Sequence, residues 1–412
     1  MRNDRSRLLG SLFALLGTTA GADPDPAVKE PAAFAKGSNA FGVELYRRLK
    51  EGTGNRAFSP ASLSTALAMA WGGARGETAA EIQRVLRLPG LPPEAMRESG
   101  RLLAELQGGE RGVTLRIANR LFGERSYRFE TSYLEATRAA YGAPLEPVDF
   151  RRGFEAARVF INGWVEAQTE KRIPDLVPPG GLDADTRLVL VNAIYFRGDW
   201  AKPFGREATR LAPFHTSPSA RSDVPTMHQT ETFGWMQGDR FQALALAYAR
   251  GGFSMLVLLP DAVDGLAALE DGLTAEALDR IVATLVPTRV ALALPKFEVN
   301  PARAASLSPL LQDLGLSAAF DRDRADFTGI ADPRDPRDRL FIGEVFHKAF
   351  VKTDEKGTEA AAATAVPMMR IGSAMPSRPV PFVADHPFLF LIRDDASGLV
   401  LFMGRVSDPS AK

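Results

Sequence analysis

The sequence of 412 residues predicts a single domain of the α+β class. Apolar side chains at helical spacing are concentrated in the first half of the chain, and alternating strand-like segments dominate the second half. After residue 33, no internal repeat and no flexible interior linker interrupts the chain. A hydrophobic content of 45% with 24% charged residues fits one globular unit with a buried core.

The predicted helices begin close to the N-terminus. Phe41, Leu45 and Leu49 recur every four residues and predict an amphipathic helix. The apolar run Leu63–Trp71 follows the helix-start pair Ser59-Pro60 and predicts a buried helix. Further helices are predicted at Thr78–Leu86, Thr131–Tyr141 and Ala156–Thr169, with a strand between them at Val113–Leu121.

Strands dominate the second half. Leu188–Phe196 is a strong, strand-like apolar run. Asp332–Arg339 is charged and broken by proline, so we expect a surface loop there. The other predicted strands are Phe241–Tyr248, Phe253–Leu259, Val290–Phe297, Phe341–Val351 and Pro387–Ile392.

A long segment of low hydrophobicity separates the last two predicted strands. Its small side chains have a period of two, which would place alternate residues on opposite faces of a strand. The residues of one face are Thr358, Ala360, Ala362, Thr364, Val366 and Met368. An alanine-rich helix is the competing interpretation, but Gly357 and Pro367 oppose it. The pattern is typical of a loop that can become a strand.

The start of this segment resembles the reactive-centre loop hinge of serpins. The hinge residues are Glu355, Lys356, Gly357, Thr358, Glu359, Ala360, Ala361, Ala362, Ala363 and Thr364. Other serpin-like motifs occur in order along nearly the whole chain, at Asn55–Ser64, Gly72–Thr78, Leu190–Trp200, Asp385–Ile392 and Phe402–Val406. On these motifs the chain is identified as a member of the serpin family.

The resemblance implies a serpin domain at 34–412, with a large central β-sheet A, smaller sheets B and C, about nine helices and an exposed reactive-centre loop at about 355–381. It implies a suicide inhibitor of serine proteases, with cysteine proteases as an alternative. The protease cuts the loop and forms an acyl-enzyme, and the freed loop inserts into sheet A. A non-inhibitory serpin, acting as a chaperone or carrier, is the alternative. Small hinge residues favour inhibition.

Five further residues match serpin positions, four of them beneath the central strands and one at the top of the sheet. Ser59, Ser62, Asn192 and His347 match a buried polar cluster called the shutter, and Trp200 matches the breach, where insertion begins. Buried polar groups of this kind must hydrogen-bond one another. The competing interpretation of His347 and Trp200 is ordinary core packing.

Two positions compete for the scissile bond. Counting from Glu355 at the usual family spacing places the bond between Ile371 and Gly372, which suits elastase-like or subtilisin-like proteases. A loop one residue shorter places it between Arg370 and Ile371, which suits trypsin-like proteases. A count back from Pro387 reaches Pro376-Ser377, but cleavage after proline is disfavoured. The remaining candidates are Met369, Met375 and Arg378.

The N-terminus predicts export. Residues 1–22 combine a basic start, a short apolar core and the small-residue site Ala20-Gly21-Ala22, as signal peptides do. An uncleaved anchor is the alternative. Residues 23–33 form a Pro/Ala tether. Export without a cysteine or an N-glycosylation sequon fits a bacterial secreted or periplasmic protein better than an animal one.

Other functional classes find little support. The chain has no motif of a hydrolase, a P-loop or a dinucleotide site, so an enzyme is disfavoured. Its 4 histidines are not at metal-ligand spacing, and we expect no metal and no cofactor. With 50 basic and 50 acidic residues, nothing points to nucleic acid or a membrane surface. Arg97 and Arg101 are offset by neighbouring glutamates, so heparin is not an expected ligand. We expect a monomer.

Overall fold

The structure is a computed structural model that describes residues 33–411 apart from residues 51, 53, 109–111 and 359–377. The predicted signal peptide and residues 23–32 of the predicted tether therefore lie outside the described residues, as do most of the predicted loop residues, whereas Ala33, the last residue of the predicted tether, begins α1.

Ten α-helices occur within the described part of the chain, against about nine expected from the family resemblance. They are α1 (Ala33–Leu49), α2 (Pro60–Gly73), α3 (Gly76–Leu86), α4 (Pro92–Gln107), α5 (Thr131–Tyr141), α6 (Phe150–Gln168), α7 (Leu266–Gly272), α8 (Ala275–Thr284), α9 (Ser308–Asp313) and α10 (Ser317–Phe320). The start of α2 shows the local cause. The Ser59 hydroxyl accepts a hydrogen bond from the Ser62 amide, and Pro60 occupies the first helical turn. None of these helices is both long and apolar enough to cross a membrane.

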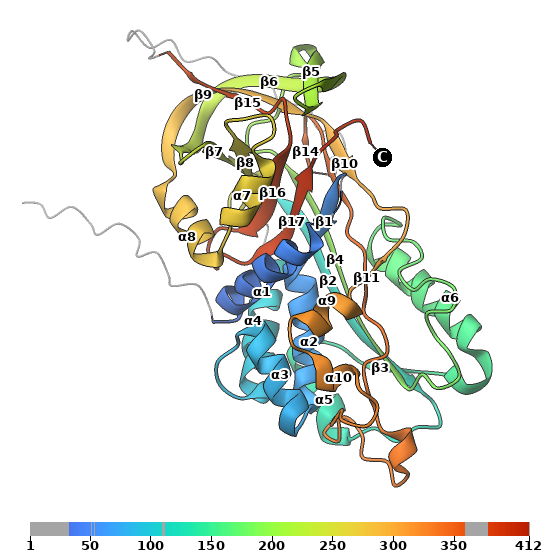
Figure 1. The fold of residues 1–412 in the computed structure, drawn as a ribbon. Helices are drawn as coiled ribbons and strands as arrows, with labels where there is room; N and C mark the ends of the chain where they lie inside the picture. The colour runs from blue at the N-terminus through green and yellow to red at the C-terminus, as the bar shows by residue number, and fades with distance from the viewer. Residues whose placement is uncertain (1–32, 51, 53, 109–111, 359–377, 412) are drawn as a thin grey trace, which may run out of the picture.

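A six-stranded sheet, here called the central sheet, carries the start of the loop hinge. Its strands in spatial order are β10 (Phe297–Val299), β13 (Val351–Thr353), β14 (Gly357–Thr358), β4 (Leu188–Asp199), β2 (Val113–Glu124) and β3 (Leu145–Val148). Side chains of β4 alternate between two cores: Ile194 and Phe196 face the main core, whereas Val191 and Ala193 face a second core beneath α6. The central sheet therefore lies between α6 on one side and the helices α1–α5 on the other (Figure 1).

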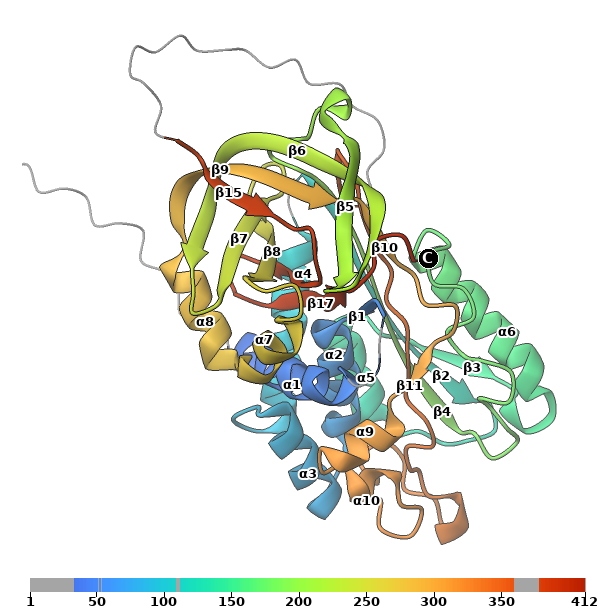
Figure 2. The ribbon, with the colours of Figure 1, turned by 45° about the horizontal axis from the view of Figure 1, so that its top comes forward.

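The remaining large sheet is a continuous set of nine strands. In spatial order they are β1 (Arg56–Phe58), β17 (Val400–Val406), β16 (Phe388–Asp394), β8 (Phe253–Pro260), β7 (Phe241–Ala247), β6 (Ala220–Gln237), β9 (Val286–Pro295) and β15 (Val380–Val383), with β5 (Arg210–Ser217) paired to β6. Figure 2 shows β6, β9 and β15 together at one end of the molecule. A small pair joins β11 (Ala305–Ser306) to β12 (Phe346–His347).

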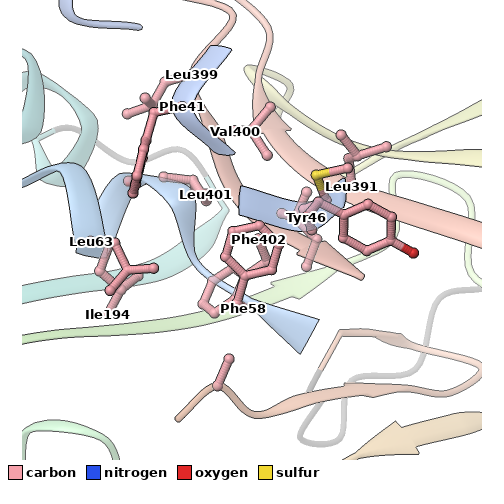
Figure 3. Close-up of a cluster of buried hydrophobic side chains, with 14 of the residues drawn as sticks. Phe41, Tyr46, Phe58, Leu63, Ile194, Leu391, Leu399, Val400, Leu401 and Phe402 are labelled. Carbon is pink, nitrogen blue, oxygen red and sulfur yellow. The ribbon is translucent and has the colours of Figure 1, made fainter. Parts of the chain in front are cut away.

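The main core joins the two ends of the chain. Side chains from α1 and α2 meet side chains of the C-terminal strands β16 and β17, with Phe58 of β1 and Ile194 of β4 between them (Figure 3). Phe41, Leu63 and Phe402 are almost completely buried there. Burial of this apolar surface is the main source of stability in a chain that has no cysteine.

The predicted strand Phe341–Val351 is wrong as a continuous element. The structure has only β12 and, after a break, β13. Before β12, the backbone groups are bonded elsewhere: the Ile342 amide donates to the Ala319 carbonyl, and the Val345 carbonyl accepts from the Leu307 amide. These hydrogen bonds to α10 and to the start of α9 hold the first part of the segment outside a strand ladder. The long β5–β6 hairpin was not predicted, since its exposed polar positions obscure the alternation.

Candidate functional site

The start of the loop hinge forms a strand inside the central sheet. Gly357 pairs with Asp199 and Thr358 pairs with Gly198 on β4, while Thr358 also pairs with Thr353 on β13. The strand β14 therefore has a partner on both sides, and Thr358 is 2% exposed. These two residues already occupy an interior strand position in the intact chain.

Gly357 is required by the close approach of two backbones. A Cβ atom at this position would lie 1.9 Å from the carbonyl oxygen of Gly198 and 2.7 Å from the Cα atom of Asp199. Backbone atoms cannot move aside as a flexible side chain can. Any other residue here would push the hinge away from β4.

The hydroxyl of Thr358 contacts a buried tyrosine. The Thr358 Oγ1 and Tyr248 Oη atoms are 2.6 Å apart. The Tyr248 ring stacks on Trp200, with ring centres 4.7 Å apart and planes inclined by 14°. Burial raises the pKa of Tyr248 far above its usual value, which keeps the hydroxyl protonated and able to donate.

Trp200 donates two hydrogen bonds to the turn Asp354–Lys356, which leads into β14. Its indole Nε1 donates to the Asp354 carbonyl at 3.0 Å, and its backbone amide donates to the Lys356 carbonyl at 2.6 Å. Within the turn, the Asp354 carboxylate accepts from the Lys356 amide at 2.9 Å. The tryptophan predicted at the breach is therefore in direct contact with the hinge turn.

Glu355 fixes the same turn through contacts of its side chain and of its backbone carbonyl. Its carboxylate lies 3.0 Å from Lys296 Nζ and accepts from the Thr209 hydroxyl at 3.0 Å. Its carbonyl accepts from the Phe204 amide at 2.8 Å. Burial acts to raise the pKa of Glu355, but the hydrogen bonds and the lysine charge hold that pKa below its usual range. The carboxylate is thus a charged anchor.

The four residues predicted as the shutter lie around one small cavity. Its volume is about 20 Å³, room for about one water molecule. Ser59, Ser62, Asn192 and His347 all line it. The Ser59 amide donates to His347 Nε2 at 3.0 Å, and the Ser62 hydroxyl donates to the Asn192 carbonyl at 3.3 Å.

His347 is neutral in this site. Its Nε2 atom accepts a hydrogen bond and therefore carries no proton. Burial lowers the pKa of His347 to about 4. Asn192 donates to the side-chain oxygen of Asn119 on β2 at 2.6 Å, while its own side-chain oxygen is buried without a partner among the described residues. The cavity beside Asn192 is large enough for one water molecule that could donate to this oxygen.

Comparison with known proteins decides the family. The model of the family described as "Serpin (serine protease inhibitor)" matches residues 36–409. The chain belongs to the serpin family. A leukocyte elastase inhibitor from Equus caballus is 40% identical to this serpin over 379 residues, covering 90% of the chain and 97% of the relative.

Solved serpin structures have the same fold. The structure titled "Cleaved Serpin 42Da" superposes with a TM-score of 0.82 at 31% identity, covering 92% of this serpin and 99% of that chain. A crystal structure of uncleaved ovalbumin gives a TM-score of 0.81 at 30% identity, covering 91% and 100%. The predicted α+β class and serpin fold are therefore confirmed.

In this serpin the two edges of β4 differ in the backbone pairing that the described residues provide. On its other edge, β4 pairs with β2 from Leu188 to Gly198. On the hinge side, pairing within the described residues is confined to Gly198 and Asp199. A strand edge whose backbone groups are not engaged by a neighbouring strand is a template for another strand.

Several predicted site residues lie outside the described residues. These are Glu359, Ala360, Ala361, Ala362, Ala363, Thr364, Arg370, Ile371 and Gly372. Conversely, Tyr248, Lys296, Thr209 and Asn119 contact the site although the sequence argument did not single them out. Tyr248 is the last residue of the predicted strand Phe241–Tyr248. Its hydroxyl, in an otherwise apolar run, was the one sequence feature that could have indicated a role in the site. No group of acidic, histidine or cysteine residues suited to a metal ion occurs in the described ranges.

Proposed function

We propose that this serpin inhibits serine proteases as a suicide substrate and is not itself an enzyme. The observation that carries the proposal is β14, a strand begun by the hinge and paired on both sides, beside an edge of β4 whose strand pairing among the described residues is confined to Gly198 and Asp199. Relatives named leukocyte elastase inhibitor support it, since they match nearly the whole chain.

The proposed mechanism starts with attack of the protease serine on the scissile carbonyl. The bond is cut, the new amine end leaves, and an acyl-enzyme remains on the hinge side of the loop. That end of the loop is then free to extend β14. If it does so before water hydrolyses the acyl-enzyme, the attached protease is carried along and its active site is distorted.

The register of β14 defines the inserted strand. Because β14 runs antiparallel to β4, each further loop residue would pair one residue earlier in β4. Continuing in this way places Thr364 opposite Asn192 and Met368 opposite Leu188. Thr364 would then face the main core beside the shutter, where the unpaired Asn192 oxygen needs a donor.

The strand ladder is the driving force. About ten further loop residues would enter the sheet, and at roughly 0.5–1.5 kcal/mol per net hydrogen bond they supply on the order of 10 kcal/mol. Pro367 would fall opposite Val189 and lacks an amide, so the lower end of the inserted strand is weakened.

For the target we propose proteases with apolar primary pockets, elastase-like or subtilisin-like, cutting between Ile371 and Gly372. The relatives named leukocyte elastase inhibitor support this choice. Cleavage between Arg370 and Ile371 by trypsin-like proteases is the alternative. We also propose that the monomer acts without heparin, since Arg101 in α4 is engaged by Glu105 at 3.6 Å.

The test uses elastase, subtilisin and trypsin in separate incubations. We expect an SDS-stable complex with at least one of them, and a released C-terminal fragment whose mass assigns the scissile bond. Thr358→Arg should still be cleaved without forming the complex, because its guanidinium cannot be buried in the sheet. Glu359→Arg is the matched control, since its side chain would face away from the main core. Cleavage of the wild type without any complex would favour a non-inhibitory serpin.

We further propose that the protein is exported by a bacterial cell as a secreted or periplasmic serpin. The basic start, apolar core and Ala20-Gly21-Ala22 site support export, and the missing cysteines and sequons support a bacterial source. The horse relative lends no support to this source. N-terminal sequencing of the mature protein should begin at Asp23. A mature chain that still starts at Met1 would contradict export with cleavage.

A further inference from the structure

The Tyr248 hydroxyl has a single partner among the described residues, and that partner belongs to the hinge. Tyr248 is completely buried, and its Oη atom lies 2.6 Å from Thr358 Oγ1. A buried tyrosine hydroxyl without a partner is unfavourable. The tyrosine is therefore satisfied only while Thr358 stays in the sheet.

The tyrosine ring is held by other aromatic rings and does not depend on the hinge for its position. It stacks on Trp200 and meets Phe196 edge-on, with ring centres 4.9 Å apart and planes inclined by 69°. Tyr248 and Trp200 also form an isolated bridge between their backbones. The hydroxyl thus presents a preformed hydrogen-bonding group at the position where the hinge enters the sheet.

Other contacts of the turn do not depend on the side chain at position 358. Trp200 bonds the carbonyls of Asp354 and Lys356, and Glu355 is bonded by Lys296 and Thr209. These contacts fix the turn before β14. The Tyr248 hydroxyl is the group that recognises the first inserted side chain.

We propose that Tyr248 is a positioning residue that keeps Thr358 docked in the central sheet before cleavage and thereby raises the fraction of encounters that end in a trapped protease. The proposal rests on the proposed inhibitory function. Insertion competes with hydrolysis of the acyl-enzyme, and starting a new strand is its slowest part because a first pair fixes much backbone for few bonds. A docked Thr358 supplies that first pair in advance.

The test removes one hydroxyl and keeps the ring. In Tyr248→Phe, amide hydrogen exchange in the peptide containing Gly357 and Thr358 should become about 3- to 10-fold faster, as expected for one buried hydrogen bond. The number of inhibitor molecules cleaved per protease trapped should rise. Thr358→Val should have the same effects, and the double variant should add little to either one. Thr358→Ser keeps the hydroxyl and should remain close to the wild type.

Tyr133→Phe is the matched control. Tyr133 is also buried, and its hydroxyl donates to the Met69 carbonyl at 3.1 Å, away from the hinge. This variant should lose stability without changing the number of molecules cleaved per protease trapped. A similar rise in both tyrosine variants would show that general destabilisation, not hinge docking, sets the partition.

The two proposals fail in different ways. A wild-type protein that traps no protease overturns the proposed function. In that case, amide hydrogen exchange at Gly357 and Thr358, compared between the wild type and Tyr248→Phe, still shows whether Tyr248 docks the hinge. A wild type that traps protease while Tyr248→Phe matches it in both exchange and partition overturns the role of Tyr248 alone.

Discussion

At the scale of single residues, the site depends on two residues that tolerate little change, one in the size of its side chain and the other in its protonation state. Gly357 has no room for a Cβ atom, and His347 must keep Nε2 unprotonated to accept from the Ser59 amide. Neither residue takes part in a reaction. Gly357 keeps the hinge close to β4 because it has no side chain. His347 keeps the geometry of the shutter as long as its imidazole is neutral.

The first prediction concerns the acid sensitivity of the shutter. The pKa of His347 is about 4 in the folded protein and about 6.5 in an unfolded chain. Between these values the unfolded chain binds a proton that the folded protein does not, so stability falls as the pH falls. The contribution of neutral His347 to the free energy of unfolding is fully present above pH 6.5. On the order of 3 kcal/mol of that free energy is lost by pH 4.

The measurement is the urea midpoint of unfolding as a function of pH. His347→Asn keeps a side-chain acceptor for the Ser59 amide but cannot titrate, so its midpoint should fall less between pH 6.5 and pH 4. His215→Asn on β5 controls for the loss of one histidine. Parallel pH profiles for the wild type and His347→Asn would show that His347 is not the acid-sensitive group.

Some of these residues could be predicted from the sequence and others could not. Gly357 and Thr358 belong to a contiguous motif, and Ser59 lies at a helix start, so local patterns identify them. Tyr248, Lys296 and Asn119 come from three separate strands or loops, and only the packing of those elements brings them to the site. No local pattern carries that information.

At the scale of elements, a buried charge network connects both ends of the chain. Arg405 on β17 donates to Glu270 of α7 at 3.2 Å and to the Lys50 and Gly54 carbonyls at 3.0 Å. The Tyr46 hydroxyl of α1 donates to the same Glu270 carboxylate at 2.6 Å. Burial, followed by the charge of Glu270, raises the pKa of Tyr46 well above its usual value.

The second prediction tests this network. Arg405→Met removes the cation and leaves the Glu270 carboxylate buried beside unpaired carbonyls, which should destabilise the fold by about 3–5 kcal/mol. The double variant Arg405→Met with Glu270→Leu should recover part of that loss, because the stranded charge is also removed. Urea unfolding of the three proteins gives the comparison. A single-variant loss below about 1 kcal/mol would contradict it.

The elements themselves were predictable where hydrophobic period and local capping agree. Leu63–Trp71 lies within α2, and Leu188–Phe196 lies within β4. The prediction of a continuous strand at Phe341–Val351 failed because the period of the apolar residues does not reveal that the backbone there bonds to residues of α10 and to the start of α9. The β5–β6 hairpin failed for the opposite reason, since it exposes much of its surface.

At the scale of the whole molecule, the proposed mechanism makes the intact fold a trapped state. The hinge starts a strand that, within the described residues, ends after Thr358, and the sheet offers a partner for many more residues. We propose that the sheet with the inserted loop has a lower free energy than the sheet of the intact chain. The barrier between them is the tether of the uncut loop.

The third prediction follows from this difference. Cutting the chain between Met369 and Gly372 should raise the thermal unfolding midpoint sharply, because the freed loop completes the ladder on β4. A cut in an ordinary loop lowers the midpoint, since it adds chain entropy to the unfolded state. Thermal melts of cut and uncut protein show whether the unfolding midpoint rises or falls after the cut. A cut Thr358→Arg variant, whose loop should not insert, is the control. An unchanged or lower midpoint for the cut wild type would remove the case for insertion.

The proposed insertion of the loop beside β4 also has a consequence for laboratory evolution of this protein. In most proteins, substitutions that improve heat resistance are neutral or mildly harmful to activity. Here a substitution that lets other parts of the uncut chain pair with the hinge side of β4 would remove the difference in free energy that, in the proposed mechanism, drives trapping. A library selected only for survival of heating should therefore become enriched in variants that serve as ordinary protease substrates.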